Sequence, residues 1–274
     1  MPELPEVETV RNELIPHVIG RRVTGLTFEW DGIVKKIPVE DFKRGVINQE
    51  ILALDRRGKY LIFSLSGGKY MIIHLKMTGS LLVQNTGGEL PRFTRAVIHL
   101  DNETDVVFRD PRKFGVMRLV DDPASIIGKL GPEPLKDDFT IDVFRERLAN
   151  RKAPMKALLC DQNVIAGIGS MYADEVMFDT GVYPVRLPES LTDEEKEHLY
   201  ESIRRILWDA IENKGASINT YYRPNGSKGT AHFEFNVAHR GGQPCKVCGT
   251  PIERMVVRGR GTYYCPKCQA DKSR

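Results

Sequence analysis

The stretch PCKVCGTPIERMVVRGRGTYYCPKC, residues 244–268, decides the fold of the C-terminal part of the chain. Two cysteine pairs of the form C-x2-C flank a segment of sixteen residues that can form a hairpin. Such a hairpin brings four thiolates into the tetrahedron that structural zinc adopts, and four sulfur ligands leave no open position on the metal. The sequence therefore predicts one structural Zn²⁺, bound by Cys245, Cys248, Cys265 and Cys268. The alternatives are accidental cysteine spacing and a redox-active pair.

Basic residues surround this predicted hairpin. Arg260 lies between two glycines at its expected tip, where a guanidinium could approach a phosphate closely; the alternative is a solvated turn arginine. Residues 215–274 contain ten Lys and Arg against three acids, a net charge of +7, whereas the first 214 residues carry −4. This asymmetry favours an anionic partner, with nucleic acid first, although a solvated basic surface would look the same.

Length and composition are ordinary for a globular protein. The chain has 274 residues, of which 41% are hydrophobic and 28% charged, enough for two or three domains. No apolar run approaches the roughly 18 residues that a membrane span needs. The N-terminus lacks the basic and then apolar pattern of a secretion signal, so we expect a cytoplasmic protein.

The N-terminal half predicts one helix followed by strands. Apolar residues recur at helical spacing in 5–15, and Pro16 is expected to end that helix. From about 22 to 120 the chain is rich in β-branched and aromatic residues, with hairpin turns at 66–68 and 101–104. This pattern is typical of an antiparallel sandwich or barrel.

The pattern becomes helical after residue 131. The longest helix, 191–215, begins with a capping box of Thr192 and Glu195 and ends at Gly215. A polar stretch rich in Gly, Pro and Ser follows at 216–240 and predicts a long loop, which in a compact domain is often functional.

Seven motifs follow one another along nearly the whole chain. They are PELPEVETV at the start, RRGKY at 56–60, HLKMTG at 74–79, RDPRKFG at 109–115, GPEPL at 131–135, the run KALLCDQNVIAGIGSMYADE, and the four-cysteine finger. Together they resemble the formamidopyrimidine-DNA glycosylase family, which removes oxidised purines from duplex DNA and then cleaves the backbone.

The resemblance implies an α+β fold. It comprises an N-terminal β-sandwich with a leading helix (1–130), a helical helix–two-turn–helix domain (131–240) and a four-cysteine zinc finger (241–270). A loop at about 216–236 would cover the flipped base. The implied partner is damaged double-stranded DNA, and we expect a monomer that is associated with the nucleoid.

Pro2 is the catalytic nucleophile that the resemblance implies, once Met1 is removed. Its secondary amine suits the role, because an α-amino group titrates at about pH 7.7–8.0 and is partly neutral at working pH. The resemblance makes Glu3 the general acid and base, Glu6 an orienting carboxylate and Lys59 a phosphate ligand and acid. Without it, Pro2 would merely permit methionine removal, and Glu6 would be an ordinary first-turn helix acid.

Further residues match DNA contacts of the family. Met77 and Phe114 would insert into the gap that the flipped base leaves in the base stack, and Arg112 would hydrogen-bond the unpaired cytosine. The resemblance also includes Arg260 as a catalytic-site arginine. The remaining predicted contacts are His74, Lys156, Ser170 and Tyr172.

The chain departs from the family pattern at several positions. Ser170 replaces an asparagine that helps to grip phosphate, and residues 92–96 lack the usual histidines. Residues 238–240 read Ala-His-Arg instead of Tyr-Gly-Arg, and Ala216 and Asn219 differ in the loop. These changes put lesion preference and DNA affinity in doubt, but not catalysis.

Two other functions stay open. One is the sister branch of glycosylases that prefers oxidised pyrimidines. Its members start PEGPE and lack the full wedge trio, which in this chain is Met77, Arg112 and Phe114. The other is a catalytically inactive zinc-finger DNA-binding protein, which would have no use for Pro2, Glu3, Glu6 and Lys59 together.

Overall fold

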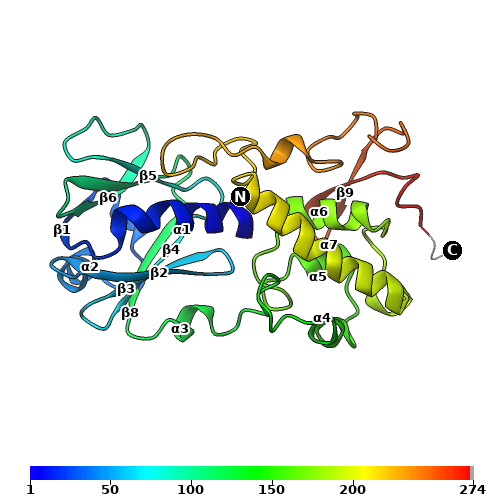
Figure 1. The fold of residues 1–274 in the computed structure, drawn as a ribbon, viewed down its shortest axis with the longest axis horizontal. Helices are drawn as coiled ribbons and strands as arrows, with labels where there is room; N and C mark the ends of the chain where they lie inside the picture. The colour runs from blue at the N-terminus through cyan, green and yellow to red at the C-terminus, as the bar shows by residue number, and fades with distance from the viewer. Residues whose placement is uncertain (272–274) are drawn as a thin grey trace. The chain divides into compact units, whose positions relative to one another are not determined.

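The computed structural model describes residues 1–271, which form two compact units (Figure 1). The first unit contains Met1–Lys129 and Asn213–His232, and the second contains Leu130–Glu212 and the residues from Phe233 onward. No helix in the described part of the chain is both long and apolar enough to cross a membrane.

The first unit contains two four-stranded antiparallel sheets. One has the order β1 (Val23–Phe28), β6 (Thr94–Leu100), β7 (Thr104–Arg109) and β5 (Ser80–Asn85). The other has the order β2 (Ile51–Arg57), β3 (Tyr60–Leu65), β4 (Tyr70–His74) and β8 (Val116–Val120). The predicted antiparallel β-sandwich is thus confirmed, and the predicted turns at 66–68 and 101–104 join β3 to β4 and β6 to β7.

The core of this unit is formed by side chains that alternate in direction along its strands, with a period of two residues. Leu61 and Phe63 of β3 and Met71 and Ile73 of β4 are buried, and so is Met117 of β8. Side chains alternate between the two faces of a sheet, so these residues share the inner face. One face of the second sheet is therefore core, and the other carries His74 and Arg118 beside the buried Ile62 and Ile72.

Helix α1 (Leu4–Val18) buries Val7, Val10 and Leu14 in the same core. The prediction that Pro16 ends this helix is wrong, because α1 continues to Val18. A proline in the last turn removes only one backbone hydrogen bond, and the next turn still closes through Ile19 N–H to the Ile15 carbonyl at 3.1 Å.

Helix α2 (Val39–Val46) was not predicted. It follows Pro38, carries acids in its first turn and buries Phe42 and Val46 at an i, i+4 spacing. The signal is present but short, and the surrounding β-rich sequence obscured it. Two other short helices in this unit are η1 (Asp31–Ile33) and α3 (Ala124–Ile127).

The second unit is helical and ends in a hairpin. Its helices are α4 (Ile141–Leu148), α5 (Met155–Leu159), α6 (Ser170–Asp179), η2 (Pro188–Ser190) and α7 (Asp193–Glu212). The hairpin consists of β9 (Glu253–Val257) and β10 (Arg260–Tyr264), and η3 (Ala231–Phe233) lies at the junction of the two units in sequence. The order of sandwich, helices and cysteine hairpin agrees with the predicted fold class.

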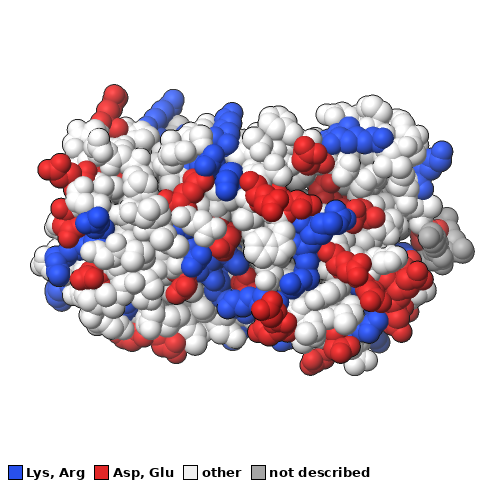
Figure 2. All heavy atoms as spheres, viewed as in Figure 1, with Lys and Arg blue, Asp and Glu red and all other residues white. Residues whose placement is uncertain are grey.

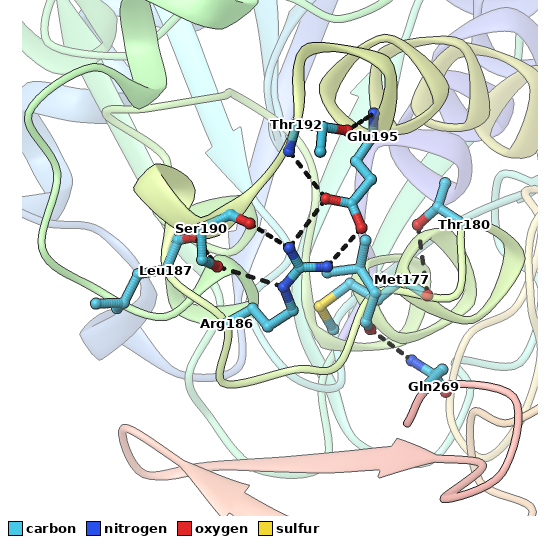
Figure 3. A network of polar contacts seen from close by, with 9 residues as sticks. Met177, Thr180, Arg186, Leu187, Ser190, Thr192, Glu195 and Gln269 are labelled. Atoms are coloured by element: carbon cyan, nitrogen blue, oxygen red, sulfur yellow. Dashed lines mark hydrogen bonds and ion pairs between the residues drawn. The ribbon is translucent and has the colours of Figure 1, made fainter. Parts of the chain in front are cut away.

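A buried arginine fixes the start of α7 (Figure 3). Thr192 and Glu195 form the predicted capping box, with N–H to oxygen distances of 3.1 and 2.9 Å. Glu195 also accepts two hydrogen bonds from the guanidinium of Arg186, at 2.6 and 2.9 Å, and Arg186 bonds Ser190 as well. The bidentate pair joins the loop before α7 to its first turn. On the face shown in Figure 2, acidic side chains gather over the same first turn, which contains Asp193 and Glu194.

The segment 213–232 groups with the sandwich. The sequence prediction assigned it to the helical domain, as part of 131–240. Hydrogen bonds of Ala216 and Tyr221 to Glu6 of α1 explain the grouping. Contacts between segments that lie some 210 residues apart leave no local signal in the sequence.

Candidate active site and nucleic-acid interface

Pro2 and Glu3 lie immediately before the first turn of α1. Both are buried, and the side chain of Glu3 is almost inaccessible. The N–H of Glu3 donates to the carboxylate of Glu6 at 2.7 Å, as part of a capping box. Because Glu6 is one helical turn further on, it fixes the backbone next to Pro2. Glu8, by contrast, forms ion pairs with Arg11 and Arg56.

The second carboxylate oxygen of Glu6 accepts the N–H of Ala216 at 2.8 Å. The hydroxyl of Tyr221 lies 3.4 Å from the Glu6 carbonyl and 3.3 Å from that of Lys214, and burial, with the charge of Glu6, raises the pKa of Tyr221 well above its usual value. Tyr221 therefore stays a hydrogen-bond donor. One carboxylate thus connects the segment that carries Pro2 to the base of the loop predicted to cover the lesion.

Gly215 permits this contact. Its φ is +76°, and a Cβ there would lie 2.9 Å from Cγ of Glu6 and 3.1 Å from the ring of Tyr221. Any other residue would be strained and would displace Glu6. The sequence indicated Gly215 only as a helix stop, and it gave no sign of Tyr221 or of the Ala216 N–H.

Lys59 lies in the turn between β2 and β3, after Gly58, whose φ is +57°. Its side chain is only 4% exposed. Lysine is rarely buried, which makes Lys59 a candidate for a chemical role. Pro2, Glu3, Glu6 and Lys59 all belong to the first unit.

The three predicted wedge residues lie on two turns of the first unit. The side chains of Met77 and Phe114 are 41% and 47% exposed, which is unusual for large apolar residues. Arg112 is also exposed, and its guanidinium lies 4.6 Å from the ring centroid of Phe114. The trio therefore presents apolar and cationic groups to solvent, as an intercalating element requires.

Asp110 holds these turns in place, a role that the sequence did not reveal. Its carboxylate is completely buried. It accepts the N–H groups of Arg112 at 3.2 Å and of Phe114 and Gly115 at 2.7 Å. It also accepts the hydroxyl of Thr78, the residue after Met77. One carboxylate thus orders both turns.

His74 ends β4 and is neutral at physiological pH. Burial lowers its pKa to about 3, with the charges of Lys76 and Lys59 adding to the effect. Its Nδ1 accepts the N–H of Lys76 at 2.9 Å, so the neutral ring carries its proton on Nε2. The ring packs edge-on against Tyr60, with centroids 4.5 Å apart. Nε2–H is therefore the group that could donate to a phosphate.

The depressed pKa of His74 predicts a loss of stability in acid. The pKa of the folded state lies below the ordinary 6.5, so the stabilisation is fully present above pH 6.5 and is lost as the pH falls towards 3. We expect up to about 1.4 kcal/mol of unfolding free energy per pH unit below 6.5, and His74→Gln should remove that slope. Urea unfolding followed by Trp30 fluorescence in a Trp208→Phe background measures it. His17→Gln, at the exposed end of α1, is the control, and an equal slope in the wild type and His74→Gln would contradict the assignment.

Lys156 and Tyr172, both predicted DNA contacts, are buried in the second unit. The ammonium group of Lys156 donates to the carbonyl of Ser170 at 2.5 Å and to Asp174 at 2.6 Å. The ring of Tyr172 packs edge-on against Phe235. Their predicted side-chain contacts with DNA stay predictions; in this structure Lys156 bonds the start of α6, and Tyr172 packs α6 against Phe235.

Ser170 and Asp174 attach α6 to the outer edge of β10. The Ser170 hydroxyl donates to the Gly261 carbonyl at 2.9 Å, and Tyr263 N–H donates to Asp174 at 3.1 Å. Burial raises the pKa of Asp174 to about 7, although the ammonium group of Lys156 opposes this shift. The Ser170 hydroxyl is therefore bonded to the finger, next to Arg260.

The finger hairpin differs slightly from the prediction. Its turn is formed by Arg258 and Gly259, both with positive φ, and the exposed Arg260 begins β10 beside the turn instead of occupying its tip. Glu175 of α6 accepts three consecutive N–H groups, from residues 236–238, at 2.8–2.9 Å and so fixes the segment that leads into the finger. The sequence did not reveal this role of Glu175.

The four cysteines of the finger come together as predicted. Their sulfur atoms all lie within 4.8 Å of one another, and two pairs are 3.5 and 3.9 Å apart. A tetrahedron with Zn–S bonds of about 2.3 Å has sulfur atoms about 3.8 Å apart, so the donor set fits one zinc ion. The prediction of a four-cysteine zinc site is confirmed.

Comparisons with known proteins agree along the whole chain. Three family models match in sequence order: the formamidopyrimidine-DNA glycosylase N-terminal domain at residues 1–117, the H2TH domain of that family at 130–222, and the zinc finger found in FPG and IleRS at 242–270. The formamidopyrimidine-DNA glycosylase of Herpetosiphon aurantiacus is 41% identical over 273 residues, covering 98% of this chain and 100% of the relative. That of Chloroflexus aurantiacus is 43% identical over 272 residues, covering 98% of each.

Solved structures are also similar to this chain over nearly its full length. The crystal structure of the FPG protein of Thermus thermophilus has a TM-score of 0.88 at 39% identity, covering 98% of both chains. The Lactococcus lactis Fpg in complex with DNA that contains an abasic site has a TM-score of 0.91 at 33% identity, covering 98% of this chain and 100% of that one. The chain therefore belongs to the formamidopyrimidine-DNA glycosylase family.

Proposed function

We propose that the protein is a DNA repair glycosylase that excises oxidised purines, namely 8-oxoguanine and formamidopyrimidines, from duplex DNA. It then cleaves the abasic strand by β,δ-elimination through a Schiff base on Pro2. The observation that carries the proposal is the burial of Pro2 and Glu3, where the Glu6 carboxylate fixes the Glu3 backbone beside Pro2. The names of the relatives support the same activity.

The chemistry begins when Met1 is removed and the amine of Pro2 is free. An α-amino group titrates at about pH 7.7–8.0, so a useful fraction is neutral near pH 7.5. The nitrogen lone pair forms a bond to the anomeric carbon C1′ and the amine gives up its N–H proton, while the glycosidic electron pair leaves with the base, which takes up a proton. Ring opening, with a proton delivered to the ring oxygen, gives an iminium cation. Glu3 is the group that we assign to these proton transfers.

The iminium ion then acts as an electron sink. Removal of a proton from C2′ drives the C3′–O bond to break, and the 3′ phosphate leaves with that electron pair. A second elimination releases the 5′ phosphate in the same way. Glu6 keeps the nucleophile in position through its bond to Glu3, and Lys59 binds a phosphate beside the lesion.

DNA recognition uses the exposed groups of both units. Met77 and Phe114 fill the space left by the flipped base, and Arg112 bonds the unpaired cytosine. His74 donates to a phosphate from Nε2, and Arg260 contacts the backbone from the finger. Support comes from Lactococcus lactis relatives solved with Fapy-dG and abasic-site DNA.

Three further predicted contacts have different expected roles. Lys156 acts by holding the start of α6, Tyr172 by packing α6 against Phe235, and Ser170 by bonding the finger next to Arg260. We propose that the protein works as a monomer on damaged DNA in the cytoplasm, at the nucleoid.

Excision rates on a panel of lesion duplexes test the substrate class. We expect 8-oxoguanine opposite cytosine and formamidopyrimidine to be excised at least about 10-fold faster than thymine glycol, a difference of about 1.4 kcal/mol in activation free energy. The measurement is single-turnover strand cleavage with gel separation. Faster excision of thymine glycol would favour the oxidised-pyrimidine branch, and binding without any cleavage would favour the inactive zinc-finger protein.

A further inference from the structure

Residues 213–232, which contain most of the predicted lesion-covering loop, are closed by hydrogen bonds at both ends. Near the base of this segment the N–H of Thr230 donates to the carbonyl of Asn213 at 2.9 Å. Near its tip the N–H of Arg223 donates to the carbonyl of Ser227, also at 2.9 Å. Because both ends are closed within the segment itself, it has a defined shape and can be held in place by a few attachments.

The side chain of Arg223 attaches the tip of the segment to helix α1. Its Nε and one terminal nitrogen donate to the same carboxylate oxygen of Glu13, at 2.8 and 2.5 Å. The two side chains are only 23% and 22% exposed. Two charge-assisted bonds fix direction as well as distance, and partial burial reduces the screening of the pair by salt. Arg223 therefore sets the position of the tip against α1.

The residues on either side of Arg223 contact two strands of one sheet. The carbonyl of Pro224 accepts the N–H of Val83 at 2.8 Å. Val83 belongs to β5, the edge strand of its sheet, so the segment covers part of an open edge (Figure 1). The ring centroid of Tyr222 lies 5.4 Å from the guanidinium carbon of Arg109 in β7, which is within the range of a cation–π interaction. Three consecutive residues thus attach the segment to β7, α1 and β5.

We propose that Arg223, through its pair with Glu13, is a positioning residue that holds the lesion-covering loop in place for base excision. The inference rests on the proposed function and deepens it: release of the oxidised base depends on this pair, whereas cleavage at an abasic site, which has no base to cover, does not. Both partners lie in the first unit. Neither belongs to the residues assigned to proton transfer or to DNA contact.

The two reactions of the enzyme, measured separately, test the proposal. We expect Arg223→Gln and Glu13→Gln each to slow single-turnover excision of 8-oxoguanine by at least about 10-fold, and to change cleavage of an abasic duplex by less than about 2-fold. Arg44→Gln removes an exposed cation that pairs with Asp41 on α2, and as the matched control it should change neither rate. Equal slowing of both reactions, or no slowing of excision, would overturn the proposal.

The double variant shows whether the two side chains act as one unit. If the pair is the anchor, Glu13→Gln combined with Arg223→Gln should excise no more slowly than the slower single variant, because the second substitution removes nothing further. A double variant that is slowed by the product of the two single effects would show that Arg223 acts independently of Glu13. That result would overturn the pair as the anchor.

Hydrogen exchange in the free protein tests the anchor without any activity. The N–H of Val83 is bonded to Pro224, so detachment of the loop exposes an amide that lies outside the loop. We expect this amide to exchange at least about 10-fold faster in Glu13→Gln than in the wild type, with the amides of α2 unchanged. Unchanged exchange at Val83 in an enzyme that excises lesions would overturn the anchor alone. Faster exchange in a protein that excises no base would refute the proposed function and retain the anchor.

Discussion

Protein that retains Met1 should excise 8-oxoguanine at least about 10³-fold more slowly than protein processed to Pro2. In the unprocessed form the nitrogen of Pro2 belongs to an amide, whose lone pair is delocalised into the carbonyl and cannot attack carbon. The two forms are separated and identified by intact mass, and single-turnover excision is measured on the same duplex. Binding to a duplex with a stable abasic-site analogue should be retained, since the wedge and the finger do not depend on the amine.

A matched pair of carboxylate variants accompanies this experiment. Glu3→Gln removes the proposed acid and base and should slow excision by about 10²–10⁴-fold. Glu8→Gln removes a carboxylate from the same helix, but Glu8 pairs with Arg11 and Arg56 and should matter little for the rate. Equal rates in the processed and unprocessed forms would contradict the role of Pro2, whatever the effect at Glu3.

Removing the zinc should strongly weaken specific DNA binding. Cys265→Ser takes away a fully buried ligand, and structural zinc in finger peptides contributes about 10–16 kcal/mol of binding free energy, which becomes folding free energy. The finger carries Arg260 and other cations, so we expect affinity for lesion duplex to fall by at least about 10²-fold. Fluorescence anisotropy measures the affinity, and a colorimetric thiol-displacement assay measures the zinc content.

Cys160→Ser provides the control for loss of a thiol. Cys160 is buried at the end of α5, outside the finger, and its replacement should leave one zinc per chain. Wild-type affinity in Cys265→Ser protein that is verified to contain no zinc would show that the finger is dispensable. The N-terminal amine should stay reactive in either variant.

The fold could be predicted from local patterns wherever those patterns were long. Strands of five to seven residues with β-branched content, and the capped helix that begins after Thr192, were found from the sequence alone. The eight-residue helix α2 was missed because only two buried positions carry its period. The extension of α1 past Pro16 was missed because a last-turn proline costs one hydrogen bond and is tolerated there.

For the site, the resemblance supplied only candidate side chains, and the roles of Pro2, Glu3, Lys59 and the wedge trio stay predictions. The groups that hold these side chains in place were not predicted. The Ala216 N–H donates to Glu6, and the buried Asp110 accepts hydrogen bonds from the turns that carry the wedge residues. Such bonds join segments distant in sequence or use backbone atoms, which no residue pattern records. The burial of Lys156 likewise depends on Asp174, whose position follows from tertiary packing alone.

Covalent trapping tests the central claim most directly. Incubation with an 8-oxoguanine duplex and borohydride should reduce the iminium ion to a stable amine and give a protein–DNA adduct. After digestion, mass spectrometry should place that adduct on the N-terminal peptide at Pro2. An adduct on Lys59 or another lysine, or strand cleavage with no adduct at all, would contradict the assignment of Pro2 as the nucleophile.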